Sequence, residues 1–191
     1  NTILTSGHCV HPPGTASNNF AESLEFFAGR DGNVDPQPGC SATQFFTPTE
    51  WSVNESEYAD WALVQLDCTV GDTVGWLGFF SLTGKTALLH QQARVQGYPG
   101  DQVFGTQWGM TDRIEASQTK MGFYDLDTAG GQSGSPVWKN RTGCGGPCGM
   151  AVHSYGNNHS TGPHVPYNHA PRITNARFGL IADLADDNFV P

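Results

Sequence analysis

The sequence predicts an all-β fold whose strands are joined by many turns. Of its 191 residues, 24 are glycine and 12 are proline, and only 14% are charged. Short apolar runs, such as residues 23–28 and 62–66, are separated by clusters of Gly, Pro, Asn and Ser, which is the pattern of strands that alternate with turns. A chain of this length also buries a sizeable core. We therefore expect a folded, turn-rich β protein.

The expected elements follow the chain in order. Residues 3–10 form a β-prone run closed by a turn of small residues, and residues 33–40 are almost all turn formers. Phe45, Phe46 and Trp51 are assigned to the core or its rim, because aromatic side chains in a β-rich chain are usually packed. The further expected strands are residues 23–28, 62–66, 73–80 and 87–98, and residues 173–184 are expected to form a last strand and a short C-terminal helix.

Residues 130–137 read Gly-Gly-Gln-Ser-Gly-Ser-Pro-Val and place Ser133 between glycines. A serine hydroxyl is a weak nucleophile, so a reactive serine needs a base and donors for the oxyanion that develops. Glycines allow a tight turn in which backbone amides converge without a Cβ in the way. Taken alone, such a motif is more often a surface turn. Its meaning depends on the residues that accompany it.

Two upstream motifs supply suitable partners. His8 lies in Ile-Leu-Thr-Ser-Gly-His-Cys-Val, and Asp60 comes just before the apolar run Ala-Leu-Val-Gln-Leu. Alone, Asp60 would be interpreted as a turn residue at the start of a strand. However, the order His, Asp, Ser along the chain is one of the few used to activate a hydroxyl nucleophile. The three motifs together therefore indicate a catalytic site.

With these motifs the sequence resembles the chymotrypsin-like serine endopeptidases, whose His, Asp and Ser motifs match residues 5–9, 60–63 and 131–136. It is most similar to the glutamyl endopeptidase branch, the V8-like and Bacillus-type enzymes. The shared phrases include Gly-His-Cys-Val, Thr-Val-Gly-Trp-x-Gly-Phe at residues 73–79, and Gln-Ser-Gly-Ser-Pro-Val. The resemblance runs nearly from end to end.

The resemblance implies two antiparallel six-stranded β-barrels with the active-site cleft between them. We expect residues 1–82 to form the N-terminal barrel, which carries His8 and Asp60. Residues 83–191 are expected to form the C-terminal barrel, which carries Ser133 and the S1 pocket. The family has two strands before its histidine, so the first barrel is expected to lack its first strands and to pair with an upstream segment.

The resemblance also implies the mechanism. Ser133 is expected to attack the scissile carbonyl, His8 to take and return the proton, and Asp60 to orient His8. The backbone amides of Gly131 and Ser133 are expected to hold the oxyanion. Trypsin-like enzymes carry an aspartate before the nucleophile that pairs with the new amino terminus. Here that residue is Gln132, so the oxyanion loop must be completed differently.

Cleavage after Glu, and less readily after Asp, is the specificity that the resemblance implies. His153 occupies the position whose histidine meets the substrate carboxylate, and Ser154, Tyr155 and Gly156 fill the three positions that run alongside the substrate. The Thr128 hydroxyl is expected to assist, because a carboxylate that loses its water needs other donors. A protonated imidazole would serve this purpose best.

Alternative functions remain open at this point. Asp127 lies six residues before Ser133, the spacing at which an aspartate selects Lys or Arg in the trypsin branch. A non-catalytic protease-fold module, either a binding protein or a toxin-like one, is a second alternative, and the intact triad argues against it. A serine esterase of the α/β-hydrolase type is a third. It requires the order Ser, Asp, His and a Gly-x-Ser-x-Gly elbow, which Ser135 breaks.

The cysteines predict disulfides and an oxidising compartment. There are five, at positions 9, 40, 68, 144 and 148, and an odd number suggests a partner outside the chain. The resemblance implies that Cys9 pairs with a cysteine of the upstream segment. Cys144 and Cys148 are expected to close a small hairpin, because no second pair accompanies them to build a metal site. Cys40 and Cys68 flank a hairpin-like region and are candidates for another disulfide, although spacing does not fix connectivity.

Charge and composition exclude several partners. A net charge of -9 argues against nucleic acid, and no apolar run is long enough to cross a bilayer. We expect a secreted, monomeric enzyme that acts on peptide or protein substrates. The lack of a signal peptide fits a mature secreted form.

No cofactor and no metal are expected. The histidines of the C-terminal region are irregularly spaced and share no face; they are His153, His159, His164 and His169. Sequons that permit N-glycosylation in a eukaryotic host begin at Asn54, Asn140 and Asn158.

Overall fold

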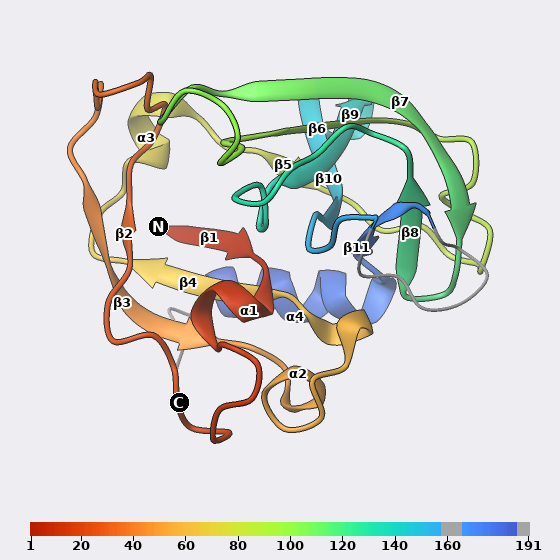
Figure 1. Cartoon of the computed structure of the whole chain (residues 1–191), viewed down its shortest axis with the longest axis horizontal. Helices are drawn as coiled ribbons and strands as arrows, with labels where there is room; N and C mark the ends of the chain where they lie inside the picture. Colours follow the sequence, from red (N-terminus) through yellow and green to blue (C-terminus); the bar gives the residue numbers. More distant parts are fainter. Residues whose placement is uncertain (158–165, 187–191) are drawn as a thin grey trace.

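The computed structural model describes residues 1–157 and 166–186, which form two β-sheets with helices at their margins (Figure 1). The strands of the first sheet come from the first 66 residues, and those of the second sheet lie between residues 78 and 171. A helix at the C-terminal end, α4 (Asn175–Asp186), completes the described chain. This architecture confirms the expected all-β fold with one short C-terminal helix.

The first sheet has four antiparallel strands in the order β1-β4-β3-β2. They are β1 (Thr2–Thr5), β2 (Glu25–Phe26), β3 (Cys40–Phe46) and β4 (Ala62–Leu66). All five residues of β4 are buried, as expected for an apolar strand with a neighbour on each side. The register of β1 on β4 sets Thr5 opposite Ala62. Because the two strands are antiparallel, the residues after Thr5 and those before Ala62 leave the sheet side by side.

The second sheet has seven strands in the order β11-β8-β7-β6-β9-β10-β5. They are β5 (Gly78–Phe79), β6 (Gln92–Gly97), β7 (Trp108–Ser117), β8 (Met121–Tyr124), β9 (Pro136–Arg141), β10 (Gly146–Val152) and β11 (Asn168–Pro171). The long strand β7 bends over the sheet in Figure 1, which gives the sheet its curled shape. The pair of β10 with β5 is parallel, whereas every other pair in this sheet is antiparallel. The described strands therefore number four and seven, in place of the six and six that the family pattern implied.

Short helical turns fill the connections between the strands. They are α1 (Gly7–Val10), α2 (Thr49–Ser52), η1 (Glu57–Ala59), α3 (Gly71–Val74) and η2 (Thr142–Cys144). His8 lies on α1, the turn that closes the first strand as expected. Residues 73 and 74 were expected in a strand, but they belong to α3, which is followed by Gly75 with a φ of 86°. A left-handed residue at the end of a helix is usually glycine, because a Cβ there is strained.

Three hydrophobic clusters support the sheets, and one of them joins the two. Val64 and Leu66 belong to the cluster of the first sheet, and Tyr124 and Val137 to that of the second. The third cluster combines Trp61 and Leu63 of the first half with Val152 of β10 and residues of α4. Burying each such side chain stabilises the fold by roughly 1.5–3 kcal/mol. The shared cluster fixes how the two sheets sit against each other.

Cys40 is bonded to Cys68 and Cys144 to Cys148, so both candidate disulfides are present. Cys9 is exposed and free. The expected link from Cys9 to an upstream segment stays a prediction. No helix in residues 1–157 or 166–186 combines the length and apolar character needed to span a bilayer.

Replacing both Cys40 and Cys68 by serine is expected to lower the free energy of unfolding by about 3.5 kcal/mol, because this bond closes a loop across 28 positions. The matched control is the double replacement of Cys144 and Cys148, which are only four positions apart and should cost about 2 kcal/mol. Denaturant unfolding of both variants measures the two values. An equal or larger loss of unfolding free energy in the control would contradict the expectation that the Cys40–Cys68 bond stabilises the fold more than the Cys144–Cys148 bond does.

Candidate active site

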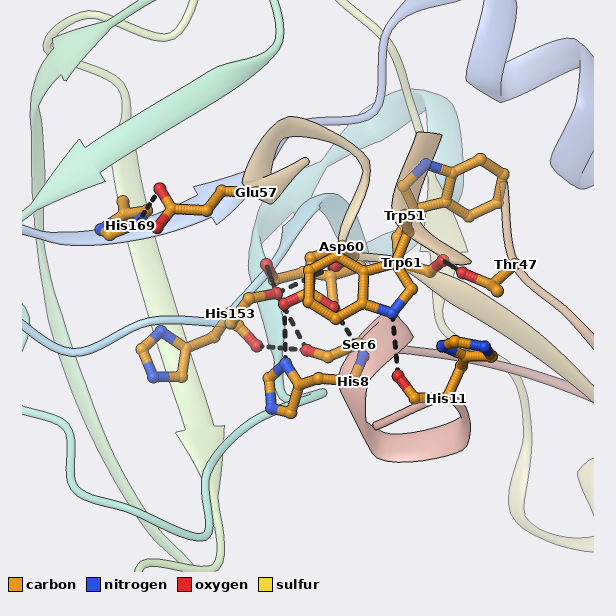
Figure 2. A network of polar contacts seen from close by, with 12 residues as sticks. Ser6, His8, His11, Thr47, Trp51, Glu57, Asp60, Trp61, His153 and His169 are labelled. Carbon is orange, nitrogen blue, oxygen red and sulfur yellow. Dashed lines mark hydrogen bonds and ion pairs between the residues drawn. The ribbon is translucent and has the colours of Figure 1, made fainter. Parts of the chain in front are cut away.

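His8 and Asp60 meet at the end of the β1–β4 pair. The Nδ1 atom of His8 lies 2.7 Å from Oδ2 of Asp60, and the backbone N–H of His8 donates to Oδ1 over 2.7 Å (Figure 2). Asp60 is fully buried, while the His8 side chain is 25% exposed. A carboxylate only accepts hydrogen bonds, so Nδ1 of His8 carries the hydrogen. In the neutral ring, Nε2 on the opposite side is then the acceptor.

Close packing around Gly7 fixes this geometry. A Cβ on Gly7 would lie 2.7 Å from the Trp51 ring and 3.0 Å from Oδ1 of Asp60, so a side chain there would displace the ring or the carboxylate. Trp51 is 3% exposed, and its indole N–H donates to the backbone oxygen of His11 over 3.0 Å. The indole therefore links α2 to the end of α1 and supports the turn that carries His8.

The loop that contains Ser133 is a tight turn between β8 and β9. Gly131 and Gly134 have φ values of 99° and 88°, which only glycine adopts without strain. Gln132 is buried, and its Oε1 atom accepts a hydrogen bond from the Ala129 amide over 2.8 Å. This contact holds the Gln132 side chain within the loop. Ser133 itself is partly buried.

The amides of Gly131 and Ser133 donate to no group in the described part of the chain. They remain available to an oxygen bound in front of the loop, as an oxyanion hole requires.

The Ser133 loop is anchored beside the His8 turn. The amide of Gly134 donates to the backbone oxygen of His153 over 2.8 Å. The same oxygen accepts from Oγ of Ser6 over 2.9 Å, and a Cβ on Gly134 would lie 2.3 Å from Oγ1 of Thr5. The residue after Ser133 is thus packed on the end of β1, two to three residues before His8. Within residues 1–157 and 166–186, no hydrogen bond joins His8 to Ser133 itself.

Buried polar residues surround His153. Its Nδ1 atom lies 2.6 Å from the Tyr124 hydroxyl, and both side chains are buried. Ser154 is 5% exposed, and its hydroxyl contacts that of Ser6 over 2.9 Å and donates to the backbone oxygen of Asp60 over 3.1 Å. Tyr155 is also buried and stacks on His169.

Gly156 follows these buried residues and is partly buried. The Oγ1 atom of Thr128 is buried and has no hydrogen-bond partner among the residues described.

Asp127 lines a pocket beside the Ser133 loop. A cavity of about 270 Å³ is lined by Asp127 together with residues of the 99–102 loop, β7 and the Ser133 loop, and these include Asp101, Trp108, Met110, Thr128 and Gln132. Neither Ser133 nor His153 lines it. Thr128 and Gln132, the residue before Ser133, do line it, so this pocket adjoins the nucleophile loop.

The two site histidines have opposite electrostatic environments. Burial alone lowers the pKa of His8, but the hydrogen bond and charge of Asp60, with smaller contributions from Cys9, raise it to about 10. Burial, followed by the charges of His169 and His8, lowers the pKa of His153 to about 4. At neutral pH, His153 is thus uncharged. The prediction that a protonated imidazole occupies this position therefore has no support in the structure.

Several residues of the site were not predicted from the sequence. Ser6 links the Ser133 loop to Ser154 through His153, and Trp51 supports Gly7. Tyr124 lies nine residues before Ser133 on β8, and its contact with His153 depends on the pairing of distant strands. Only the position of Ser6 within the Thr-Ser-Gly-His-Cys motif could have drawn attention to it.

The described residues contain one group of candidate metal ligands and two of the three predicted sequons. In the described ranges, the single group of three candidate metal ligands is Cys40, Asp67 and Cys68. The two cysteines of this group form a disulfide with each other, so their sulfur atoms are not available as metal ligands. Asn54 and Asn140 are exposed. The predicted sequon at Asn158, and His159 and His164, lie outside the described residues.

Known proteins resemble this chain over most of its length. Residues 1–144 match the trypsin-like peptidase domain family. The chain is similar to a glutamyl endopeptidase of Bacillus licheniformis, with 37% identity over 93% of the chain and 54% of the relative. It is 32% identical to a protein of Bacillus subtilis named extracellular metalloprotease, over 95% of the chain and 54% of the relative. The chain thus spans about half the length of these curated relatives.

Solved structures of two proteases resemble this chain in fold. A Glu endopeptidase in complex with MPD superposes with a TM-score of 0.80 and 26% identity, over 95% of this chain and 80% of that one. The protease Anisep from Arthrobacter nicotinovorans has a TM-score of 0.73 and 20% identity, over 93% of this chain and 80% of that one. The second likeness concerns the fold alone. With the family match over three quarters of its length, the chain belongs to the trypsin-like peptidase domain family.

Proposed function

We propose that this chain is the catalytic part of a secreted serine endopeptidase that cleaves after Glu and, less readily, after Asp. The observation that carries the proposal is the pair of 2.7 Å hydrogen bonds from His8 to the buried Asp60 carboxylate, beside the loop that presents Ser133. A buried carboxylate on Nδ1 fixes the ring tautomer and leaves Nε2 as a base.

In the proposed mechanism, Oγ of Ser133 attacks the carbonyl carbon of the scissile bond while Nε2 of His8 takes the hydroxyl proton. The amides of Gly131 and Ser133 hold the oxyanion. His8 then gives its proton to the leaving amine, the C–N bond breaks, and an acyl-enzyme remains. Water repeats the attack with His8 as base and releases the acid and Ser133. The His8–Ser133 contact is expected to tighten with substrate bound, as catalytic hydrogen bonds often do.

Three observations support recognition of a Glu side chain by His153 and Thr128. Burial raises the pKa of Tyr124 well above its usual value, so its hydroxyl keeps its hydrogen. That hydrogen needs an acceptor, and Nδ1 of His153 lies 2.6 Å away. His153 is then the tautomer with its hydrogen on Nε2, which makes the neutral ring a donor. The buried Thr128 hydroxyl without a described partner supplies a second donor.

A preference for Lys or Arg through Asp127 remains the alternative, because Asp127 lines a pocket together with Thr128 and Gln132, although neither Ser133 nor His153 lines it. Secretion is supported by two disulfides, which persist in oxidising compartments, and by the extracellular relative.

We keep residues 1–82 and 83–191 as the two proposed units, although β5 (Gly78–Phe79) already belongs to the second sheet. A peptide or protein substrate, a monomeric state and an upstream segment joined at Cys9 remain part of this proposal.

Peptide p-nitroanilides that end in Glu, Gln, Asp or Lys test the proposed activity. We expect kcat/KM to be highest for Glu, and Ser133→Ala is expected to lower kcat by about a millionfold. Equal unfolding curves of the two proteins would serve as the control for folding. Faster cleavage after Lys than after Glu would overturn the specificity, and unchanged kcat in Ser133→Ala would overturn the mechanism.

Tyr124→Phe is expected to lower the ratio of kcat/KM for Glu to that for Gln by about tenfold, because His153 loses the hydrogen bond that fixes its tautomer. The rate for Gln should change little, which separates a role in recognition from damage to the fold. A Glu to Gln ratio equal to that of the wild type would contradict the role of Tyr124 as a positioning residue.

The expected pH dependence of kcat/KM follows from His8, because its imidazole acts as a base only when it is neutral. Because its pKa is raised to about 10, kcat/KM should still be rising with pH above neutrality. Asp60→Asn removes the carboxylate that most strongly raises the pKa of His8, so the rise should move to lower pH. Rates measured from pH 6 to 10 in both proteins give this shift, and a shift to higher pH in Asp60→Asn would refute it.

A further inference from the structure

Two exposed glutamates of this chain lie in loops. Glu22 belongs to residues 11–24, a connection without helix or strand, and Glu55 lies between α2 and η1. The other exposed glutamates of residues 1–157 and 166–186 lie in regular elements; they are Glu25 in β2, Glu50 in α2 and Glu115 in β7. An enzyme that cleaves after Glu meets these residues on every other copy of itself. How firmly each loop is held therefore decides which bond is exposed to cleavage.

Glu55 is held on both sides of its peptide bond. Its amide donates to the Trp51 oxygen over 2.9 Å, and the Ser56 amide donates to the Glu50 oxygen over 2.9 Å. Its carboxylate accepts a hydrogen bond from the Gly14 amide, and its φ is 50°. A peptide that binds beside a strand is extended. Glu55 would have to break three hydrogen bonds and leave a left-handed conformation before cleavage.

The bond between Glu22 and Ser23 is much less constrained. Both residues are exposed. In the part of the chain that the structure describes, neither their amides nor their carbonyl oxygens make a hydrogen bond. On the upstream side, the nearest backbone bond joins the Ala21 amide to the Val10 oxygen over 2.8 Å. The scissile bond itself is thus free of the contacts that protect Glu55.

The segment that follows Ser23 is weakly attached to the first sheet. The Leu24 oxygen accepts from the Ala42 amide over 2.9 Å. Next comes β2, which has only two residues and lies at the outer edge of the sheet (Figure 1). Short edge elements open locally at a low cost in free energy. Such an opening releases residues 22–26 as an extended strand that fits the cleft of a second molecule.

Cleavage at this bond would divide the catalytic residues between two pieces. His8 lies on residues 1–22, whereas Asp60 and Ser133 lie on the longer piece. Both disulfides of the described ranges join residues after position 22, so neither links the two pieces. The short piece is then held by the pairing of β1 with β4 and by the bonds of His8 to Asp60.

We propose that one molecule of the enzyme cleaves the Glu22–Ser23 bond of another, and that this self-cleavage limits the lifetime of the active enzyme. The inference rests on the proposed function, because the same site and the same preference for Glu perform the cut. Ser133 of the attacking molecule forms an acyl-enzyme with the Glu22 carbonyl, and the Ser23 amine leaves. Water then releases Glu22 as a new C-terminal carboxylate. The cleaved protein carries its base, His8, on a separate peptide.

An inactive copy of the chain tests where the cut occurs. Ser133→Ala, labelled with heavy nitrogen, serves as the substrate for a trace of unlabelled wild type in native buffer. Mass spectrometry at early times should find the first new amino terminus at Ser23. Adding Glu22→Gln to the substrate chain should slow this cut by at least about tenfold. The matched control, Glu55→Gln in the same background, should leave its rate unchanged.

The outcomes separate this inference from the proposed function. A first cut at another bond, or no cut by a wild type that cleaves Glu p-nitroanilide, overturns self-cleavage at Glu22 alone. Cleavage of neither substrate overturns the proposed function too. A cut at Ser23 that Glu22→Gln does not slow would also refute the inference.

A second measurement tests the effect on lifetime. Cleaved wild type should lose its p-nitroanilide activity at a lower urea concentration than the intact protein, because the peptide that carries His8 dissociates on unfolding. The difference should grow as the protein is diluted. Equal urea midpoints of the cleaved and intact proteins would contradict a role of the cut in ending activity.

Discussion

A buried carboxylate determines much of the arrangement of this protein. Asp60 is fully buried, and removing an ionised group from water costs several kcal/mol unless donors replace the lost hydrogen bonds. Two donors of one residue, the backbone N–H and Nδ1 of His8, meet this need. The turn after β1 must therefore approach the end of β4 closely. This approach explains why residue 7 is glycine and why Trp51 is buried against it.

His153 connects the chemistry to substrate recognition. Its backbone oxygen accepts hydrogen bonds from Gly134 and Ser6, which hold the Ser133 loop beside the His8 turn. Its side chain bonds Tyr124 in the second sheet. One residue thus fixes the nucleophile loop with its main chain and faces the proposed Glu site with its side chain. The cluster of Trp61, Leu63 and Val152 keeps the two sheets in register with these contacts.

The sequence was sufficient to predict features that depend on local motifs. The all-β fold, the C-terminal helix and both disulfides are present in the structure, and Asp60 and His8 meet as their motifs indicated. Turn chemistry and the local motifs around His8 and Asp60 carry this information, although these two residues lie 52 positions apart and Cys40 lies 28 positions from Cys68.

Features that depend on distant contacts could not be predicted. The contact of Tyr124 with His153 arises from the pairing of strands far apart in the chain, and no residue spacing in the sequence indicates it. Residues 73 and 74 were expected in a strand but lie in α3, because the Gly-rich segment closes a turn there. The surroundings of Asp127 depend on distant contacts as well, since β7 and the 99–102 loop line its pocket together with Thr128, Ala129 and Gln132.

The most direct test of the account is the site and rate of modification by a fluorophosphonate, measured by mass spectrometry of the intact chain and its peptides. The account predicts one adduct per chain, on Ser133, formed at least a hundredfold more slowly in His8→Ala. An adduct on another serine, or an equal rate in His8→Ala with its fold intact, would contradict the claim that these side chains form one catalytic unit.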